Sequence, residues 1–260
     1  MKQNILNIGF GTDKGNVRHE NQDSLYVNLG KIGKHHYCLI AVADGMGGSG
    51  DGKFASSLVV GALDAWWRNV LPEMLSTTPD LFLIRDSLKS ALVEANKTLW
   101  NQCQARCPGS GSTVSAAFVF DCHLIYVHVG DSRIYLTDSN SMLQITKDHT
   151  WCQQEIEAGN LSPEEAALHP KRHVLANVVG VTENVAVESG YVLLEMHNKI
   201  VICSDGLYGF LTNEEIFKLL KNEKNIQKAV SKILKNTLKT AARDNVSVIL
   251  LSQTRKLFNF

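Results

Sequence analysis

The amino-acid sequence predicts an α+β fold in which antiparallel sheets and helices form separate layers. Two observations lead to this class. Strand-like runs come first, two long helical blocks follow, and further strands, helices and a last strand complete the chain, without the regular β-α-β alternation of a parallel sheet. Residues 112–146 also combine short apolar runs, period-two alternation and tight turns, which is typical of an antiparallel meander.

The first half of the chain contains three expected strands and two expected helices. Clusters of Gly, Asn and Lys bound the strand-like runs. Both helical blocks place apolar residues at helical spacing, and Pro72 and Pro79 separate them. The expected strands are residues 5–11, 24–30 and 36–44, and the expected helices are residues 52–70 and 80–105.

The second half continues with strands, and one insert interrupts them. Residues 151–170, WCQQEIEAGNLSPEEAALHP, contain Gly159, a helix cap at Ser162 and a stop at Pro170, which together predict two short helices joined by a turn. We treat residues 151–178 as a flap insert. The other expected elements are strands at 112–120, 123–132, 133–138, 142–146, 185–196, 199–205 and 245–253, and helices near 213–221 and 225–241.

Length and composition indicate one globular domain over residues 1–260. The chain has 44% hydrophobic and 20% charged residues, and no repeat, low-complexity tract or linker interrupts it. Lys and Arg balance Asp and Glu at 26 each, so charge gives no reason to expect nucleic acid as a partner. No signal peptide and no run of roughly 20 apolar residues is present, which predicts a cytoplasmic location and no membrane partner.

Residues 42–52, VADGMGGSGDG, match the G-x-G-x-x-G pattern of a dinucleotide-binding turn. The context contradicts that interpretation, because two helical blocks follow before the next strand and no β-α-β unit forms. Asp44 would also repel a pyrophosphate unless a cation lay between them. An isolated Asp-Gly pair is usually turn chemistry, but this one is not isolated.

Five aspartates lie at the ends of apolar strand-like runs. Magnesium and manganese prefer such oxygen ligands, and strand ends would hold them rigidly with one side open to water. Gly45 has no side chain, so its carbonyl could approach a metal that Asp44 also binds. The sequence therefore predicts a hard-cation site. The five aspartates are Asp23, Asp44, Asp131, Asp205 and Asp244.

At these residues the chain resembles the metal-dependent phosphatases of the protein phosphatase 2C family, in its bacterial form. The motifs occur in the family's order over nearly the whole chain. The resemblance implies a central sandwich of two antiparallel sheets flanked by helix pairs, with a two-metal site at one end. The matching stretches are GNVRHENQDS (15–24), VADGMGG (42–48), GSTVSAAFV (111–119), HVGDSRIYL (128–136), TKDHT (146–150), EAGNLSPEEAALHPKRHVLANVVG (157–180), CSDGLYGFL (203–211) and ARDNVSV (242–248).

The resemblance also implies a role for each site residue. Asp44 matches the carboxylate that bridges two Mn²⁺ or Mg²⁺ ions, with the Gly45 carbonyl on one of them. Asp205 and Asp244 match ligands of the other ion. The remaining matches are Asp131, which with Asp205 holds a third ion in bacterial members, Asp23, which acts through water, and Arg18, which grips the substrate phosphate with its bidentate fork.

Two residues depart from the pattern of many family members. Gln22 stands where a glutamate is common, and Met46 stands where eukaryotic members carry a histidine proposed as general acid. Bacterial members share the methionine, so this departure does not argue against activity. It leaves the proton donor to the leaving group unassigned. His149, in KDHT, is a candidate, although a lone histidine beside a turn is more often structural.

The predicted activity is hydrolysis of phosphoserine and phosphothreonine by a metal-activated water, without a covalent intermediate. No cysteine has the C-x₅-R spacing of cysteine-dependent phosphatases, and no D-x-D-x-T motif appears. The expected partners are phosphorylated proteins, the substrates of a cognate Ser/Thr kinase, and we expect a monomer. Two alternatives are a weakly active regulatory module that binds phosphoproteins and a phosphatase of small phosphorylated metabolites.

Overall fold

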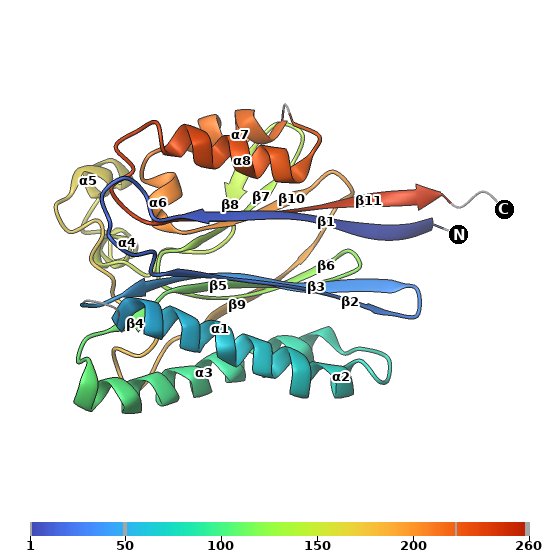
Figure 1. The fold of residues 1–260 in the computed structure, drawn as a ribbon, viewed down its shortest axis with the longest axis horizontal. Helices are drawn as coiled ribbons and strands as arrows, with labels where there is room; N and C mark the ends of the chain where they lie inside the picture. Colours follow the sequence, from blue (N-terminus) through green and yellow to red (C-terminus); the bar gives the residue numbers. More distant parts are fainter. Residues whose placement is uncertain (1, 49–50, 222, 258–260) are drawn as a thin grey trace.

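The structure is a computed structural model that describes residues 2–48, 51–221 and 223–257. Figure 1 shows four layers: a helical layer, two sheets face to face, and a second helical layer. Every strand pairing within the two sheets is antiparallel. The predicted sandwich of two antiparallel sheets flanked by helix pairs is therefore confirmed.

The first sheet joins the two ends of the described chain. Its order is β1-β11-β10-β7-β8. β1 and β11 pair along their whole length, from Lys2 opposite Leu257 to Asp13 opposite Val246. The five strands are β1 (Lys2–Asp13), β7 (Arg133–Thr137), β8 (Met142–Gln144), β10 (Lys199–Cys203) and β11 (Val246–Leu257).

The second sheet has the order β2-β3-β5-β6-β9, with the short β4 paired to the end of β3. The meander predicted over residues 112–146 is wrong as a continuous unit: β5 and β6 pair in this sheet, whereas β7 and β8 pair in the first sheet. The six strands are β2 (Asp23–Ile32), β3 (His35–Met46), β4 (Gly111–Ser112), β5 (Val114–Phe120), β6 (His123–Val129) and β9 (Glu188–Leu193).

Central strands are apolar on both faces because each face meets a different layer. On β3, Ile40 and Val42 pack between the sheets against residues such as Ile202 of β10. The alternate residues Leu39 and Ala41 face the helices that cover the second sheet instead. The continuous apolar run of β3 therefore serves two cores at once.

Two long helices cover the second sheet. One of them, α1 (Asp51–Asn69), contacts β2 and β3 of that sheet. The longer one, α3 (Leu81–Arg106), begins at Asp80, whose carboxylate accepts hydrogen bonds from the amides of Phe82 and Leu83. On the first sheet lie α7 (Asn213–Lys221) and α8 (Ile226–Thr237). No helix in the described ranges combines the length and apolar character that a membrane span requires.

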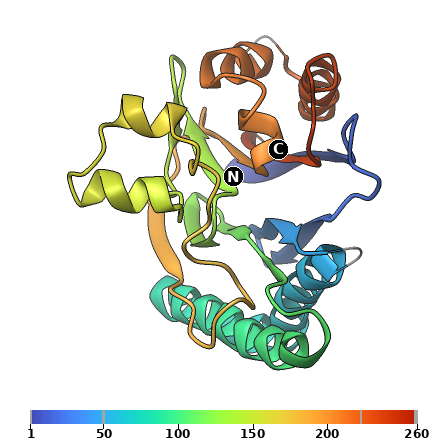
Figure 2. The same ribbon diagram turned by 90° about the vertical axis from the view of Figure 1, so that its left-hand side faces the viewer.

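The flap insert lies at the end of the sandwich opposite the chain termini (Figures 1 and 2). Its helices are α4 (Trp151–Glu157) and α5 (Pro163–Leu168). The Ser162 hydroxyl oxygen accepts a hydrogen bond from the Glu165 amide, and the Glu165 carboxylate accepts one from the Ser162 amide, which completes a capping box. Two short helices were not predicted. They are α2 (Leu71–Met74), which contains Pro72, and α6 (Asp205–Tyr208), which begins at a predicted site residue.

Candidate metal centre

A cleft of about 500 Å³ opens at the flap end of the sandwich. It is bounded by the ends of β3 and β6, the start of α6, the turn before β11 and the returning segment of the flap. Six of the eight predicted site residues line it: Arg18, Asp44, Gly45, Asp131, Asp205 and Asp244.

Antiparallel pairing explains why aspartates distant in sequence meet there. Asp23 begins β2 and is directly opposite Asp44 near the end of β3. Asp205 lies two residues after the end of β10, and Asp244 lies two residues before β11, the neighbour of β10. Adjacent antiparallel strands run in opposite directions, so the end of one strand lies beside the start of its neighbour. The aspartates at these positions therefore meet at one end of the sandwich.

Asp23 is buried and does not line the cleft wall. The Ser204 hydroxyl donates a 2.8 Å hydrogen bond to Asp23 Oδ2, and Ser204 directly precedes Asp205. Asp23 therefore lies behind the cleft, where it links the start of β2 to the start of α6.

The carboxylates of the cleft suppress one another's ionisation. Burial, and then the charges of Asp23 and Asp205, raise the pKa of Asp44. Burial and Asp131 raise the pKa of Asp205 in the same way. For Asp131, burial and the charge of Asp148 raise the pKa from 3.8 to about 6. A cluster of acids that repel each other at neutral pH is stabilised by a bound cation.

Two orphaned oxygen atoms support the same conclusion. Among the described side chains, only three buried polar atoms lack a hydrogen-bond partner, and two of them are Asp23 Oδ1 and Asp205 Oδ1. Buried carboxylate oxygens without a partner are costly unless they bind metal or water. The residues present therefore fit a divalent-cation site.

Gly45 is required by a close approach of two backbones. A Cβ atom at Gly45 would lie 1.9 Å from the carbonyl oxygen of Gly52 and 2.9 Å from that of Gln22. The glycine thus lets the end of β3 pack against the first turn of α1. Gln22 and Met46, the two departures from the family pattern, both line the cleft.

Arg18 forms a bidentate ion pair with Asp244. Its Nε and Nη2 atoms lie 2.9 Å and 2.7 Å from the two carboxylate oxygens. The side chain is 55% exposed, so the guanidinium stands at the open side of the cleft. The arginine expected to bind phosphate and the aspartate expected to bind metal are therefore in direct contact.

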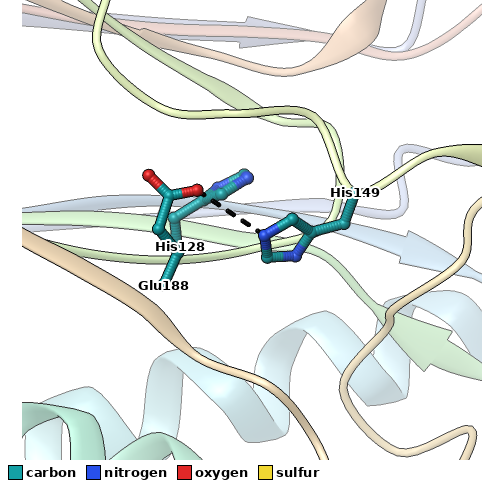
Figure 3. A group of neighbouring side chains, drawn as sticks. All are labelled: His128, His149 and Glu188. Atoms are coloured by element: carbon teal, nitrogen blue, oxygen red, sulfur yellow. Dashed lines mark ion pairs between the residues drawn. The ribbon is translucent and has the colours of Figure 1, made fainter. Parts of the chain in front are cut away.

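His149 is not brought to the cleft wall. Its Nδ1 atom faces the amide of Gly130 at 3.2 Å and Asn177 Nδ2 at 2.9 Å, and its Nε2 atom faces Glu188 Oε2 at 3.6 Å. Figure 3 shows His149, Glu188 and His128 as one group of neighbouring side chains. The ring is thus occupied by contacts within the protein.

Sequence reasoning missed Thr113 and Asn245, which are buried and line the cleft. Thr113 Oγ1 accepts a 3.1 Å hydrogen bond from the Asp44 amide. Asn245 Oδ1 accepts from the Gln22 amide at 2.8 Å, and its Nδ2 donates to the Lys14 and Glu20 carbonyls. Asn245 thereby fixes the loop that carries Arg18. Its place beside Asp244 in ARDN was the available signal.

An α-β-β-α sandwich with an aspartate cluster and an arginine at one end is the arrangement expected of the metal-dependent phosphatases. Comparison with known families bears this out. The chain matches the family model described as Protein phosphatase 2C over residues 11–250. It belongs to the protein phosphatase 2C family, so the resemblance inferred from its motifs is confirmed.

Curated relatives and solved structures agree with this assignment. The serine/threonine phosphatase stp of Listeria welshimeri is 29% identical over 252 residues, which cover 95% of this chain and 96% of that protein. The serine/threonine phosphatase of S. agalactiae is 30% identical, with a TM-score of 0.87 over 95% of this chain and 99% of that one. The catalytic domain of the phosphatase PstP, solved with two manganese ions, is 28% identical, with a TM-score of 0.80 over 97% and 100% of the two chains.

Proposed function

We propose that this protein phosphatase removes phosphate from serine and threonine side chains of proteins, with a metal-activated water as nucleophile. The observation that carries the proposal is the convergence of four aspartates and Arg18 on one cleft in a chain of this family. The names of the relatives and the manganese-bound neighbour support the substrate class and the metal dependence.

Asp44, Gly45, Asp205 and Asp244 would hold two Mn²⁺ or Mg²⁺ ions, and Asp131 with Asp205 would hold a third. When bound, these ions supply positive charge and a water of lowered pKa. The oxygen-only character of the ligands suits either metal. Asp23 keeps Ser204, and through it the start of α6, at a fixed distance from β2.

The chain's own residues bind and orient the phosphate group. Arg18 is the cationic side chain at the open side of the cleft, and its guanidinium offers parallel N–H donors to two phosphate oxygens. Asn245 holds the loop on which Arg18 stands. Thr113 fixes the Asp44 backbone. These contacts preorganise the site before substrate arrives.

A second pocket of about 450 Å³ supports a polypeptide substrate. It lies between the flap helices and α6, and it shares Asp131 and His173 with the metal cleft. Its flap side combines apolar residues such as Ile156 and Ala166 with polar ones, among them Arg172. Residues beside the phosphoserine could occupy this pocket. Within one domain over residues 1–260, the insert at 151–178 would therefore contact the substrate.

The cellular setting belongs to the same proposal. The substrates are the targets of a cognate Ser/Thr kinase, and the enzyme acts in the cytoplasm as a monomer. A deletion strain compared by phosphoproteomics with a strain carrying Asp205→Ala would reveal those substrates. Proteins whose phosphorylation rises in both strains are the targets.

The direct test combines metal removal with ligand substitution. Chelator should abolish hydrolysis of aryl phosphate and of phosphopeptides, and added Mn²⁺ should restore it. Asp44→Ala and Asp205→Ala should each lower kcat/KM by about 100-fold or more, since losing a ligand should cost at least as much as losing a residue that supports one. Asp86→Ala, on the exposed face of α3, is the control and should leave activity unchanged.

Three results would contradict the proposal. Full activity in chelator, or in either aspartate variant, would refute the metal site. Metal binding without turnover of any phosphoester would favour the regulatory module. Turnover of small metabolites far above that of phosphopeptides would favour the metabolite phosphatase.

A further inference from the structure

His149 and Gly130 bind each other through reciprocal hydrogen bonds. The His149 amide donates to the Gly130 carbonyl at 2.7 Å, and the Gly130 amide donates to His149 Nδ1 at 3.2 Å. Both backbone polar groups of Gly130 are therefore satisfied by one residue. Gly130 directly precedes Asp131, whose side chain is 5% exposed and reaches the metal cleft.

The position of Gly130 admits only a glycine. Its φ angle of 103° is in the region that favours glycine. A Cβ atom there would lie 2.6 Å from the side chain of Thr113. Thr113 in turn accepts the hydrogen bond from the Asp44 amide. Gly130 is thus held between His149 on one side and the residue that fixes Asp44 on the other.

The same histidine also fixes the returning end of the flap. The Ala176 amide donates to the His149 carbonyl at 2.8 Å. Asn177 Nδ2 lies 2.9 Å from His149 Nδ1 and 2.6 Å from the Ala186 carbonyl. One residue therefore links the backbone before Asp131 to the returning segment of the flap.

These contacts are inconsistent with a proton donor or a metal ligand at this position. His149 Nδ1 faces two N–H donors and so accepts hydrogen bonds, which leaves the proton on Nε2, directed at Glu188 (Figure 3). His128 is committed as well, because its Nε2 lies 3.0 Å from the Lys147 carbonyl and must donate to it. Each of the three side chains therefore contacts neighbouring groups of the protein beside the cleft.

We propose that His149 is a positioning residue, which sets Asp131 through Gly130 and the flap through Asn177. This role rests on the proposed metal-dependent phosphatase activity. It replaces the role of proton donor to the leaving group, for which His149 was a candidate.

The test compares two substitutions that separate positioning from proton donation. In His149→Asn, the Oδ1 atom can accept from the Gly130 amide as Nδ1 does, but the side chain cannot act as an acid. His149→Ala loses both capacities. His197→Ala, at an exposed histidine paired with Glu195, is the control. The readouts are Mn²⁺ affinity by calorimetry and kcat for aryl phosphates whose leaving groups differ in pKa.

We expect His149→Ala to weaken Mn²⁺ binding by about tenfold, as is usual for residues that orient metal ligands. His149→Asn should recover most of that affinity. The loss of kcat in His149→Ala should be the same for good and poor leaving groups. Nuclear magnetic resonance of the wild-type protein should show His149 with its proton on Nε2, which needs no variant to fold.

Three outcomes would overturn the proposal: a loss of kcat that grows with poorer leaving groups and is not rescued by Asn, a lowered melting temperature with unchanged Mn²⁺ affinity, or a proton on Nδ1. Failure of the proposed function is a different result. In that case the wild-type protein itself would neither bind Mn²⁺ nor hydrolyse aryl phosphate.

Discussion

At the scale of single residues, Arg18 and Asp244 each have a second expected partner, which is phosphate for Arg18 and a metal ion for Asp244. The structure pairs them in a bidentate contact. That hydrogen bond, together with the charge of Asp244, raises the pKa of Arg18, which is charged at any accessible pH. A phosphate that enters the cleft would compete for the N–H donors of Arg18, and a metal ion would compete for the carboxylate oxygens of Asp244.

Replacing Arg18 should therefore weaken substrate binding. Arg18→Ala should raise KM for aryl phosphate, and Arg18→Lys should restore only part of the loss, because an ammonium group cannot make two parallel hydrogen bonds. Steady-state kinetics in saturating Mn²⁺ measures the effect, and Arg68→Ala, an exposed arginine on α1, is the control. An unchanged KM in Arg18→Ala would remove Arg18 from the phosphate site.

Asp131 makes the stability of the metal-free protein depend on pH. Its pKa is about 6 in the folded chain and returns to 3.8 on unfolding, so the folded state binds more protons between these values. Stability from this group is present below about pH 4 and is lost as the pH rises through about 6.

Asp131→Asn keeps the shape of the side chain without its charge. In chelator, we expect the variant to gain stability over wild type as the pH rises from 4 to 7, by about 1 to 3 kcal/mol. Saturating Mn²⁺ should reverse the order, because the metal binds the ionised carboxylate. Urea denaturation at several pH values measures both effects. A pH-independent difference in chelator would contradict the pKa shift.

At the scale of elements, some residues of the flap stabilise its helices and others line the second pocket. Glu165 completes the capping box of α5, so its substitution would damage the helix as well as any substrate contact. Glu164 is exposed and does not line the pocket, whereas Arg172 does. Substrate selection is therefore best tested at Arg172.

Arg172→Ala should lower kcat/KM for phosphopeptides several-fold and leave aryl phosphate hydrolysis unchanged. Binding energy from groups remote from phosphorus is available to a peptide and not to a small ester. Glu164→Ala is the matched control on the same flap. Equal losses on both substrates, together with a lower melting temperature, would show that the insert is only a structural cover.

Element prediction succeeded where one physical signal dominated. The strand β3 was predicted from an apolar run, and α5 from the Ser162 cap. The short helix α6 was missed, because four residues after a strand are too few to show helical periodicity. α2 was missed because Pro72 was interpreted as the break between two helices. Proline breaks the interior of a helix but is well tolerated in its first turn, where Pro72 lies.

At the scale of the whole molecule, the sequence could predict that aspartates end strands, but not which strand ends meet. The family resemblance supplied that arrangement, and the pairing of Asp23 opposite Asp44 then accounts for part of it. Contacts between distant segments had no local signal. Asn245 bonding to Lys14, and Arg18 to Asp244, join residues more than 220 positions apart. His149 was only a candidate for an unassigned proton donor, and only the fold revealed its contacts with Gly130 and Asn177.

The pairing of β1 with β11 has a mechanical consequence. Both ends of the described chain lie at the same edge of the molecule, opposite the flap (Figure 1). Opposed forces on the two termini would load the rungs between these strands one at a time, beginning at Lys2 and Leu257. In single-molecule pulling we expect a low rupture force, like the opening of a zipper, followed by loss of the sheet that β11 shares with β10. A high, single-step rupture, typical of strands sheared along their length, would contradict this geometry.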